Sequence, residues 1–295
     1  MQFFFAMSNL AASDYIPLAR HAERCGYTGV CIPDSICYPQ TSATEYPYNS
    51  DGSREFLKDK PFLEPFSLAP ALAASTQSLR IRTLVYKLPV RNPVLAAKSA
   101  TSVAVLSDNR FDFGIGLSPW PEDYALGEQP WQARGKRMDE MVEIIRGLSS
   151  GEFYRFKGDF YEIMPIQLCP VPTRRLPIMM GGHSGPALRR AALLGDGWLH
   201  AGGDHDEMVS MIQQLRTLRN EHGLGDQPFD IHVGSTLAFS VEGLQELAAL
   251  GVSSVGITFT DAYRAQQLDD AGGTMEKLEG FAESVMRPYR ATLRH

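Results

Sequence analysis

The sequence lacks the features that mark several specialised classes of protein. It has only four cysteines, none in a Cys-x-x-Cys pair, and no histidines at metal-finger spacing, so we predict structural thiols and no metal site. No uninterrupted apolar segment approaches the roughly 20 residues that span a bilayer. The first residues carry no basic start, and their apolar run is too short for a secretion signal. These absences predict a cytoplasmic protein without a membrane span.

The charge pattern is also unremarkable for a soluble chain. The 295 residues carry a net charge of −6, with 44% hydrophobic and 21% charged residues. There is no basic run and no stripe of lysine and arginine, which argues against nucleic acid as a partner. We therefore expect a small-molecule substrate.

What the sequence does have is a regular alternation of strand and helix patterns. Strands are predicted at 2–7, 27–33, 79–86, 111–116, 177–181, 196–200, 230–238 and 252–258. Helices are predicted at 13–25, 64–76, 93–107, 131–149, 184–194, 204–222, 241–250 and 274–292. Eight strands, each followed by a helix, predict a closed parallel α/β barrel, the (β/α)8 TIM barrel, formed by 1–295 as a single domain. An open doubly wound sheet is the alternative, but no strand-turn-helix carries Gly-x-Gly-x-x-Gly.

Long connections suggest where such a barrel would bind a ligand. Segments 34–63, 117–130 and 259–273 follow the second, fourth and eighth strands, and so lie at the carboxyl end of the barrel, where active sites are found. Their aromatic residues favour ordered lids over disorder. Segment 151–176 differs, because its alternating pattern around Gly158 predicts a hairpin inserted before the fifth strand.

Residues 84–117 form the most informative stretch. Asn92 and Pro93 begin a helix, since proline at the first turn costs no hydrogen bond. Gly114 and Gly116 end the next strand, where the flat face of a ligand can approach the backbone or where space in the barrel is limited.

A second glycine pair stands immediately before a predicted helix, in Gly181-Gly182-His183-Ser184. Backbone N–H groups at a helix start suit a phosphate. A tight strand-to-helix turn without any ligand explains the same residues, and both interpretations stay open from the sequence pattern.

With these residues in view, the chain resembles the luciferase-like monooxygenase superfamily, and within it the branch of coenzyme F-420 (deazaflavin)-dependent oxidoreductases. The resemblance is carried by Leu88-Pro-Val-Arg-Asn-Pro, Leu106-Ser-Asp-Asn-Arg-Phe, Phe113-Gly-Ile-Gly-Leu, Arg134-Gly-Lys-Arg-Met-Asp-Glu and the segment from Gly181 to Trp198. It covers nearly the whole chain. The motifs are specific for the superfamily and much less so for the flavin that is bound.

The resemblance implies a ring-binding site at the carboxyl ends of the strands. The ring would lie against Leu84, Val85 and Tyr86, with a non-proline cis peptide near Val85-Tyr86. The glycine turn would hold the flavin phosphate, and His183 would add a donor. It further implies that Gly114 and Gly116 admit the ring, that Ser118 hydrogen-bonds it, and that the protein is a homodimer. Tyr86, Trp120 and Tyr124 either form an aromatic wall or pack the lid.

Two residues are candidates for proton transfer. Asp34 ends the second strand, and helix capping or loop bracing is its alternative role. Relatives commonly have histidine after this acid, whereas this chain has Ser35, whose hydroxyl does not titrate near neutral pH. His200 ends the sixth strand at the predicted mouth, where it either transfers a proton or is simply a hydrogen-bonded structural histidine.

The sequence thus predicts an oxidoreductase that transfers a hydride between coenzyme F-420 and an organic substrate. One alternative is an FMN-dependent monooxygenase with a partner reductase, which would share the barrel and the phosphate turn. Another is a flavin-binding protein without catalysis, to which Ser35 lends weight. A flavin-free lyase or isomerase is disfavoured, because Lys87 is the only lysine near a strand end.

Overall fold

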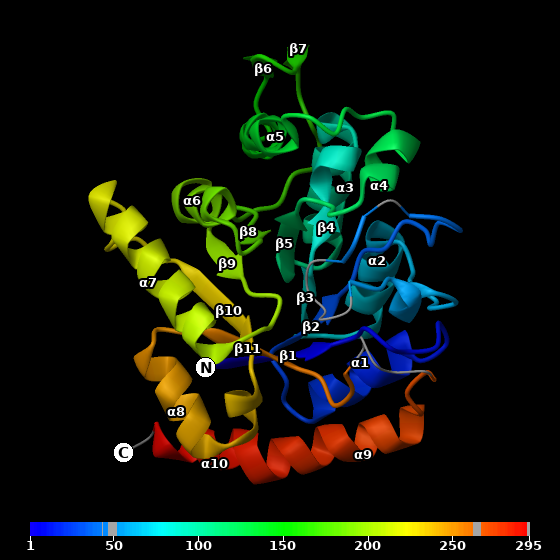
Figure 1. Cartoon of the computed structure of the whole chain (residues 1–295), viewed down its shortest axis with the longest axis vertical. Coiled ribbons are helices and arrows are strands. Elements are labelled where there is room, and N and C mark those ends of the chain that lie inside the picture. The colour runs from blue at the N-terminus through cyan, green and yellow to red at the C-terminus, as the bar shows by residue number, and fades with distance from the viewer. Residues whose placement is uncertain (43, 47–51, 262–266, 294–295) are drawn as a thin grey trace.

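The computed structural model describes residues 1–295 except 43, 47–51, 262–266 and 294–295. Parallel strands close into a barrel with helices around it (Figure 1). The strand order is β3-β2-β1-β11-β10-β9-β8-β5, and β3 pairs with the first residues of β5 to complete the ring. The short strand β4 pairs with the last residues of β5, beyond the end of β3. The predicted α/β barrel is therefore confirmed.

The strands of the barrel sheet are β1 (Gln2–Ala6), β2 (Gly29–Ile32), β3 (Arg80–Thr83), β4 (Tyr86–Lys87), β5 (Phe111–Gly116), β8 (Ile178–Gly181), β9 (Gly197–Leu199), β10 (Asp230–Gly234) and β11 (Ser254–Ile257). The α-helices are α1 (Tyr15–Arg24), α2 (Pro65–Ser75), α3 (Pro93–Leu106), α4 (Pro121–Leu126), α5 (Arg134–Leu148), α6 (Gly185–Leu194), α7 (His205–Glu221), α8 (Val241–Ala249), α9 (Ala271–Phe281) and α10 (Arg287–Thr292).

The structure departs from the predicted elements in several places. The predicted strand 230–238 ends at Gly234, and Thr236–Phe239 form a 3₁₀ helix instead. The third predicted strand, 79–86, is divided by a non-proline cis peptide at Leu84–Val85, one bond earlier than expected. The loop 117–130 contains α4, begun by Pro121 and acidic residues in its first turn. The last predicted helix starts three residues early, and a π-helical turn at Ala282–Met286 joins α9 to α10.

Helix α3 begins where the sequence pattern placed its start. The Asn92 side chain accepts hydrogen bonds from the backbone N–H groups of Val94 and Leu95, at 2.9 and 3.2 Å. Pro93 follows at the first helical position, where its missing N–H would have had no helical partner. Local chemistry thus fixes how the chain leaves β4 and re-enters the barrel at β5.

The inside of the barrel is closely packed at Gly114. All six residues of β5 are buried, and a Cβ atom on Gly114 would collide with the carbonyl oxygen of Thr83. The structure therefore supports barrel packing as the reason for this glycine.

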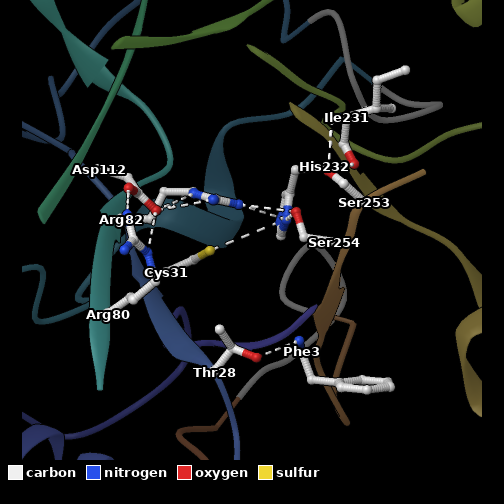
Figure 2. A network of polar contacts seen from close by, with 10 residues as sticks. All are labelled: Phe3, Thr28, Cys31, Arg80, Arg82, Asp112, Ile231, His232, Ser253 and Ser254. Atoms are coloured by element: carbon white, nitrogen blue, oxygen red, sulfur yellow. Dashed lines mark hydrogen bonds and ion pairs between the residues drawn. The ribbon is translucent and has the colours of Figure 1, made fainter. Parts of the chain in front are cut away.

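A layer of polar side chains crosses the barrel interior below the mouth (Figure 2). Arg82 on β3 is fully buried and donates to Asp112 on β5 at 3.0 Å and to Ser254 on β11 at 3.1 Å. It also donates to His232 Nδ1 on β10 at 3.0 Å, while His232 Nε2 lies 3.8 Å from Cys31 Sγ. Burial, followed by the charge of Arg82, holds the pKa of His232 well below its usual value. These contacts tie together five strands of the ring.

The predicted hairpin is present and lies outside the barrel. Strands β6 (Tyr154–Lys157) and β7 (Glu162–Ile166) pair antiparallel, and they lie beyond α5 at one edge of the molecule (Figure 1). Glu140 on α5 accepts hydrogen bonds from the backbone N–H groups of three hairpin-turn residues, 159–161. This carboxylate attaches the insertion to the helix layer.

In the described part of the chain, none of the helices combines the length and the apolar character needed to cross a membrane.

Candidate active site

Val85 is the central residue of the predicted ring platform, the segment Leu84, Val85 and Tyr86 against which the ring is expected to lie. A Cβ atom on Gly116 would lie 2.6 Å from Val85 Cγ2, and one on Gly181 would lie 2.9 Å from Val85 Cγ1. The two glycines, at the ends of β5 and β8, therefore make room for this side chain. Leu84 and Val85 are both partly exposed, so they offer an apolar surface where these strands end.

Tyr86 is directed away from that surface. Its ring is buried and packs against Phe66 and Phe113, with centroid distances of 4.7 and 5.4 Å. The Arg91 guanidinium lies 3.9 Å from the Tyr86 ring centroid. Burial raises the pKa of Tyr86, so its hydroxyl stays protonated at neutral pH. These contacts favour packing behind the platform over contact with a ligand ring.

The glycine turn after β8 has the geometry of an anion site. Gly182 has a φ of +124°, which glycine adopts readily, and its carbonyl accepts a hydrogen bond from Trp198 Nε1 at 2.9 Å. Ser184 precedes α6 and makes no capping hydrogen bond in the described structure, and the first turn of α6 has no acidic residue. The N–H groups of this helix start therefore suit an anionic group.

His183 connects this turn to the loop after β9. Its Nε2 accepts a hydrogen bond from the backbone N–H of Ala201 at 3.1 Å. Its ring stacks on His200, with centroids 4.7 Å apart and planes 16° from parallel. Burial lowers the pKa of His183, which favours the neutral ring that this acceptor role requires.

His200 is the most unusual polar group of the site. It lies just after β9, is only 2% exposed, and packs against Trp198 at a centroid distance of 5.2 Å. Neither ring nitrogen has a hydrogen-bond partner that meets normal geometry among the described residues. Burial and the neighbouring His183 lower the pKa of His200 to about 4, although a polar contact with the backbone of Gly234, outside normal hydrogen-bond geometry, acts in the opposite direction. Buried polar atoms are nearly always paired, so these nitrogens are available to a hydrogen-bonding group from outside the described residues.

Asp34 is held by one cation and one backbone N–H group. Its carboxylate accepts hydrogen bonds from Arg91 Nη1 and Nη2, at 2.7 and 2.9 Å. The backbone N–H of Lys87 donates to the same carboxylate at 2.8 Å. This bidentate pairing supports the loop-bracing role that the sequence left open, because the Asp34 carboxylate links the loop after β2 to the end of β4.

Replacing Arg91 with methionine is expected to lower the free energy of unfolding by about 2–3 kcal/mol, because it leaves the buried Asp34 carboxylate without its charged partner. Arg91→Lys should recover only part of this loss, since lysine lacks the planar fork. Urea denaturation measures the effect. Arg287→Met removes a solvent-exposed pair with Glu283 and is the matched control, with an expected loss below about 1 kcal/mol. Equal losses in the two variants would contradict the bracing role.

Ser118 makes its side-chain hydrogen bonds within the segment that follows β5. Its hydroxyl donates to Asp123 Oδ2 at 2.5 Å and accepts from the backbone N–H of Trp120 at 3.1 Å. Lys87 Nζ donates to the same Asp123 oxygen at 2.7 Å. All four side chains are buried, so neither Ser118 nor Lys87 presents a free polar group. Asp123 Oδ1 is buried and unpaired among the described atoms.

The sequence pattern did not single out Arg54, Arg91 or Asp123 as site residues. Arg91 stands inside the Leu-Pro-Val-Arg-Asn-Pro motif, which was available as a signal, and follows β4 after the 3₁₀ turn Leu88–Val90. Arg54 and Asp123 lie in segments 34–63 and 117–130, which contain no decodable motif. Their roles depend on partners far along the chain, such as Glu122 for Arg54.

The structure also brings together three potential metal ligands that the sequence spacing did not indicate. His21, Cys25 and Glu279 lie close enough for their ligand atoms to share an ion. However, His21 Nδ1 accepts a hydrogen bond from Arg24 at 3.0 Å, which places the ring proton on Nε2. Nε2 is the nitrogen that lies 3.2 Å from Glu279 Oε1. A protonated nitrogen does not ligate a metal, so we assign this group to helix pairing between α1 and α9.

Comparison with known proteins identifies the family. The luciferase-like monooxygenase family matches residues 5–278, and the chain therefore belongs to that family, as the sequence motifs predicted. An uncharacterized protein of Mycobacterium tuberculosis is 46% identical over 97% of this chain and 99% of its own length. An F-420-dependent glucose-6-phosphate dehydrogenase of Tsukamurella paurometabola is 31% identical over 74% of this chain and 61% of its own length.

Solved structures agree on the fold. A monooxygenase from Streptomyces bottropensis superimposes with a TM-score of 0.79 at 14% identity, covering 98% of this chain and 100% of that one. The coenzyme F-420-dependent tetrahydromethanopterin reductase of Methanopyrus kandleri gives 0.74 at 12% identity, covering 98% and 99%. The family match places the chain among luciferase-like oxidoreductases and monooxygenases.

Proposed function

We propose that this protein is an oxidoreductase that binds coenzyme F-420 and transfers a hydride between it and an organic substrate. The observation that carries the proposal is the partly exposed apolar surface of Leu84 and Val85, packed on Gly116 and Gly181 and adjoined by the glycine turn at the start of α6. Such a surface suits the face of a flat ring, and the turn suits a phosphate. When bound, the deazaflavin supplies the hydride chemistry.

The residues of the chain would divide the remaining work. Leu84 and Val85 support the ring, and the N–H groups around Gly182 and Ser184 hold the phosphate. His200 accepts the proton that the substrate releases as it gives up hydride, because its ring is neutral and its nitrogens are unpaired. Asp34 is already bound by Arg91, so we propose it as a positioning residue.

The choice of F-420 over FMN rests on relatives. The dehydrogenase that is 31% identical is F-420-dependent by name, whereas the monooxygenase neighbour, at 14% identity, shares only the fold. Fluorescence titration of the purified protein with F-420 and with FMN tests the choice. Micromolar or tighter binding of F-420 alone supports it. Tight binding of FMN alone, with oxygen consumption by the reduced enzyme, would establish the monooxygenase alternative, and binding without turnover on a broad substrate panel the non-catalytic one.

The phosphate turn gives a sharper test of the same site. Gly182→Ala should weaken binding of the cofactor at least tenfold, because a Cβ there would lie 2.7 Å from Ala187 Cβ at a φ of +124°. Gly223→Ala is a matched control, since Gly223 also has positive φ but lies in open space after α7. Its cofactor affinity should stay within twofold of the original protein. Unchanged affinity in Gly182→Ala would remove the phosphate turn from the proposal.

The expected homodimer, the cytoplasmic location and the single-domain organisation of residues 1–295 stay predictions. None of the residues assigned above depends on them.

A further inference from the structure

Arg54 is a buried cation at the carboxyl end of the barrel, in the loop that follows β2. Only 7% of the residue is exposed, and its guanidinium carbon lies 3.4 Å from the centroid of the Trp120 ring. Its Nη1 donates to Ser42 Oγ at 2.5 Å and to Glu122 Oε2 at 3.3 Å. The side chain is therefore fixed between the loop after β2 and the start of α4, which follows β5.

The opposite edge of the same guanidinium is unpaired. Nε and Nη2 are both buried, and neither has a hydrogen-bond partner in the described part of the chain. These two donors point in parallel and form the edge with which arginine binds a carboxylate or phosphate through two hydrogen bonds. A buried charged donor without an acceptor is unfavourable, so this edge suits an acceptor from outside the described residues.

We propose that the Nε–Nη2 edge of Arg54 binds a carboxylate group of the substrate. This inference rests on the proposed function, because it names the class of molecule that would react at the ring. It makes Arg54 a specificity residue that selects a substrate with a carboxylate over an uncharged analogue.

The position of Arg54 separates it from the cofactor's anion site. The phosphate turn follows β8, whereas Arg54 follows β2, and β3 and β5 lie between these strands in the ring. Arg54 and the turn therefore occupy different sectors of the carboxyl end of the barrel. A cofactor anchored at the turn leaves the Arg54 edge for another molecule.

The surrounding charges favour a single negative charge. Arg54 is paired with Glu122, and Lys87 is paired with Asp123. The two pairs lie in the same loop region, because the charges of all four residues affect the pKa of the Cys37 thiol. The two pairs leave no net charge before a ligand binds. A carboxylate brings one negative charge to the unpaired edge, whereas a phosphate dianion would add two beside Glu122.

Butyrate binding to the cofactor-free protein tests this directly, with Trp120 fluorescence as the signal because Arg54 lies on that ring. The protein should bind butyrate saturably, and should bind butyramide and inorganic phosphate at least fivefold more weakly, at constant ionic strength. Arg54→Gln should abolish the response to butyrate, and Arg54→Lys should weaken it at least fivefold, since lysine lacks the two-donor edge. Loss of the fluorescence change in Trp120→Phe would show that Trp120 is the source of the signal. Arg155→Gln, which changes an exposed hairpin residue, should bind butyrate as the original protein does.

The F-420 and FMN dissociation constants of Arg54→Gln complete the experiment. Values within twofold of the original protein support a substrate site. A tenfold or greater loss would show that the edge holds the cofactor's own anion, and would overturn the inference. Equal butyrate binding by the original protein and Arg54→Gln, or tighter binding of phosphate, also overturns it. If the original protein binds neither cofactor, the proposed function fails, while the butyrate response still decides whether Arg54 is a carboxylate site. Arg54→Lys decides the matter if Arg54→Gln does not fold.

Discussion

Asp112→Asn is expected to lower the free energy of unfolding by about 3–5 kcal/mol. The Asp112 carboxylate is 2% exposed and is paired with two arginines, Arg80 and Arg82. Arg82 is 1% exposed and has no route to solvent in the packed interior. Asparagine keeps the shape of the side chain but removes its charge, so it leaves the Arg82 cation buried without its counter-ion.

Urea denaturation, with the slope checked for two-state behaviour, measures this loss. Adding Arg82→Met to Asp112→Asn should recover part of it, because the uncompensated charge is then gone. Glu162→Gln is the control, since it breaks the Lys157–Glu162 pair, in which both side chains are about 70% exposed. That change should cost less than about 1 kcal/mol. An Asp112→Asn loss as small as the control would mean that the interior layer does not stabilise the barrel.

The barrel itself was predictable because its signals are local and repeated. Most strands are short segments rich in apolar residues, and several helices begin at a residue whose side chain caps them, as Asn92 does for α3 and Asp204 for α7. The departures occur where local patterns compete. A six-residue α4 is too short for a clear periodicity, and the cis peptide at Leu84–Val85 depends on surroundings that no local pattern encodes.

The candidate site was likewise predictable only in part from the sequence. The glycines around Val85 and the turn at Gly182 stand at strand ends, so their positions followed from the fold. What the sequence did not reveal is which polar groups are already paired. Asp34 is held by Arg91, 57 positions later, and Arg82 by His232, 150 positions later. Pairs so distant in sequence are set by the closed ring of strands, and only the structure shows that no described residue hydrogen-bonds the His200 nitrogens in normal geometry.

His200→Gln is expected to lower kcat for hydride transfer by about 100- to 10,000-fold, the usual contribution of a positioned acid or base. Glutamine keeps hydrogen-bonding capacity at this position but does not titrate near neutral pH. The dissociation constant for the cofactor should change less than threefold, because Leu84, Val85 and the backbone N–H groups around Gly182 and Ser184 are unchanged and His183 loses only its stacking partner. Stopped-flow measurement of cofactor reduction, combined with equilibrium binding, separates the two effects.

The pH dependence of kcat/KM distinguishes a proton acceptor from a residue that only packs. Because burial lowers the pKa of His200 to about 4, the ring is neutral above that pH, and the rate should fall as the pH drops through about 4. The limb should be absent from His200→Gln. His205→Gln, at an exposed histidine that contacts Glu246, should keep both the limb and the rate. A His200→Gln enzyme that retains full kcat would show that this histidine serves the packing of Trp198 and His183, and would leave proton transfer to the substrate's own groups or to solvent.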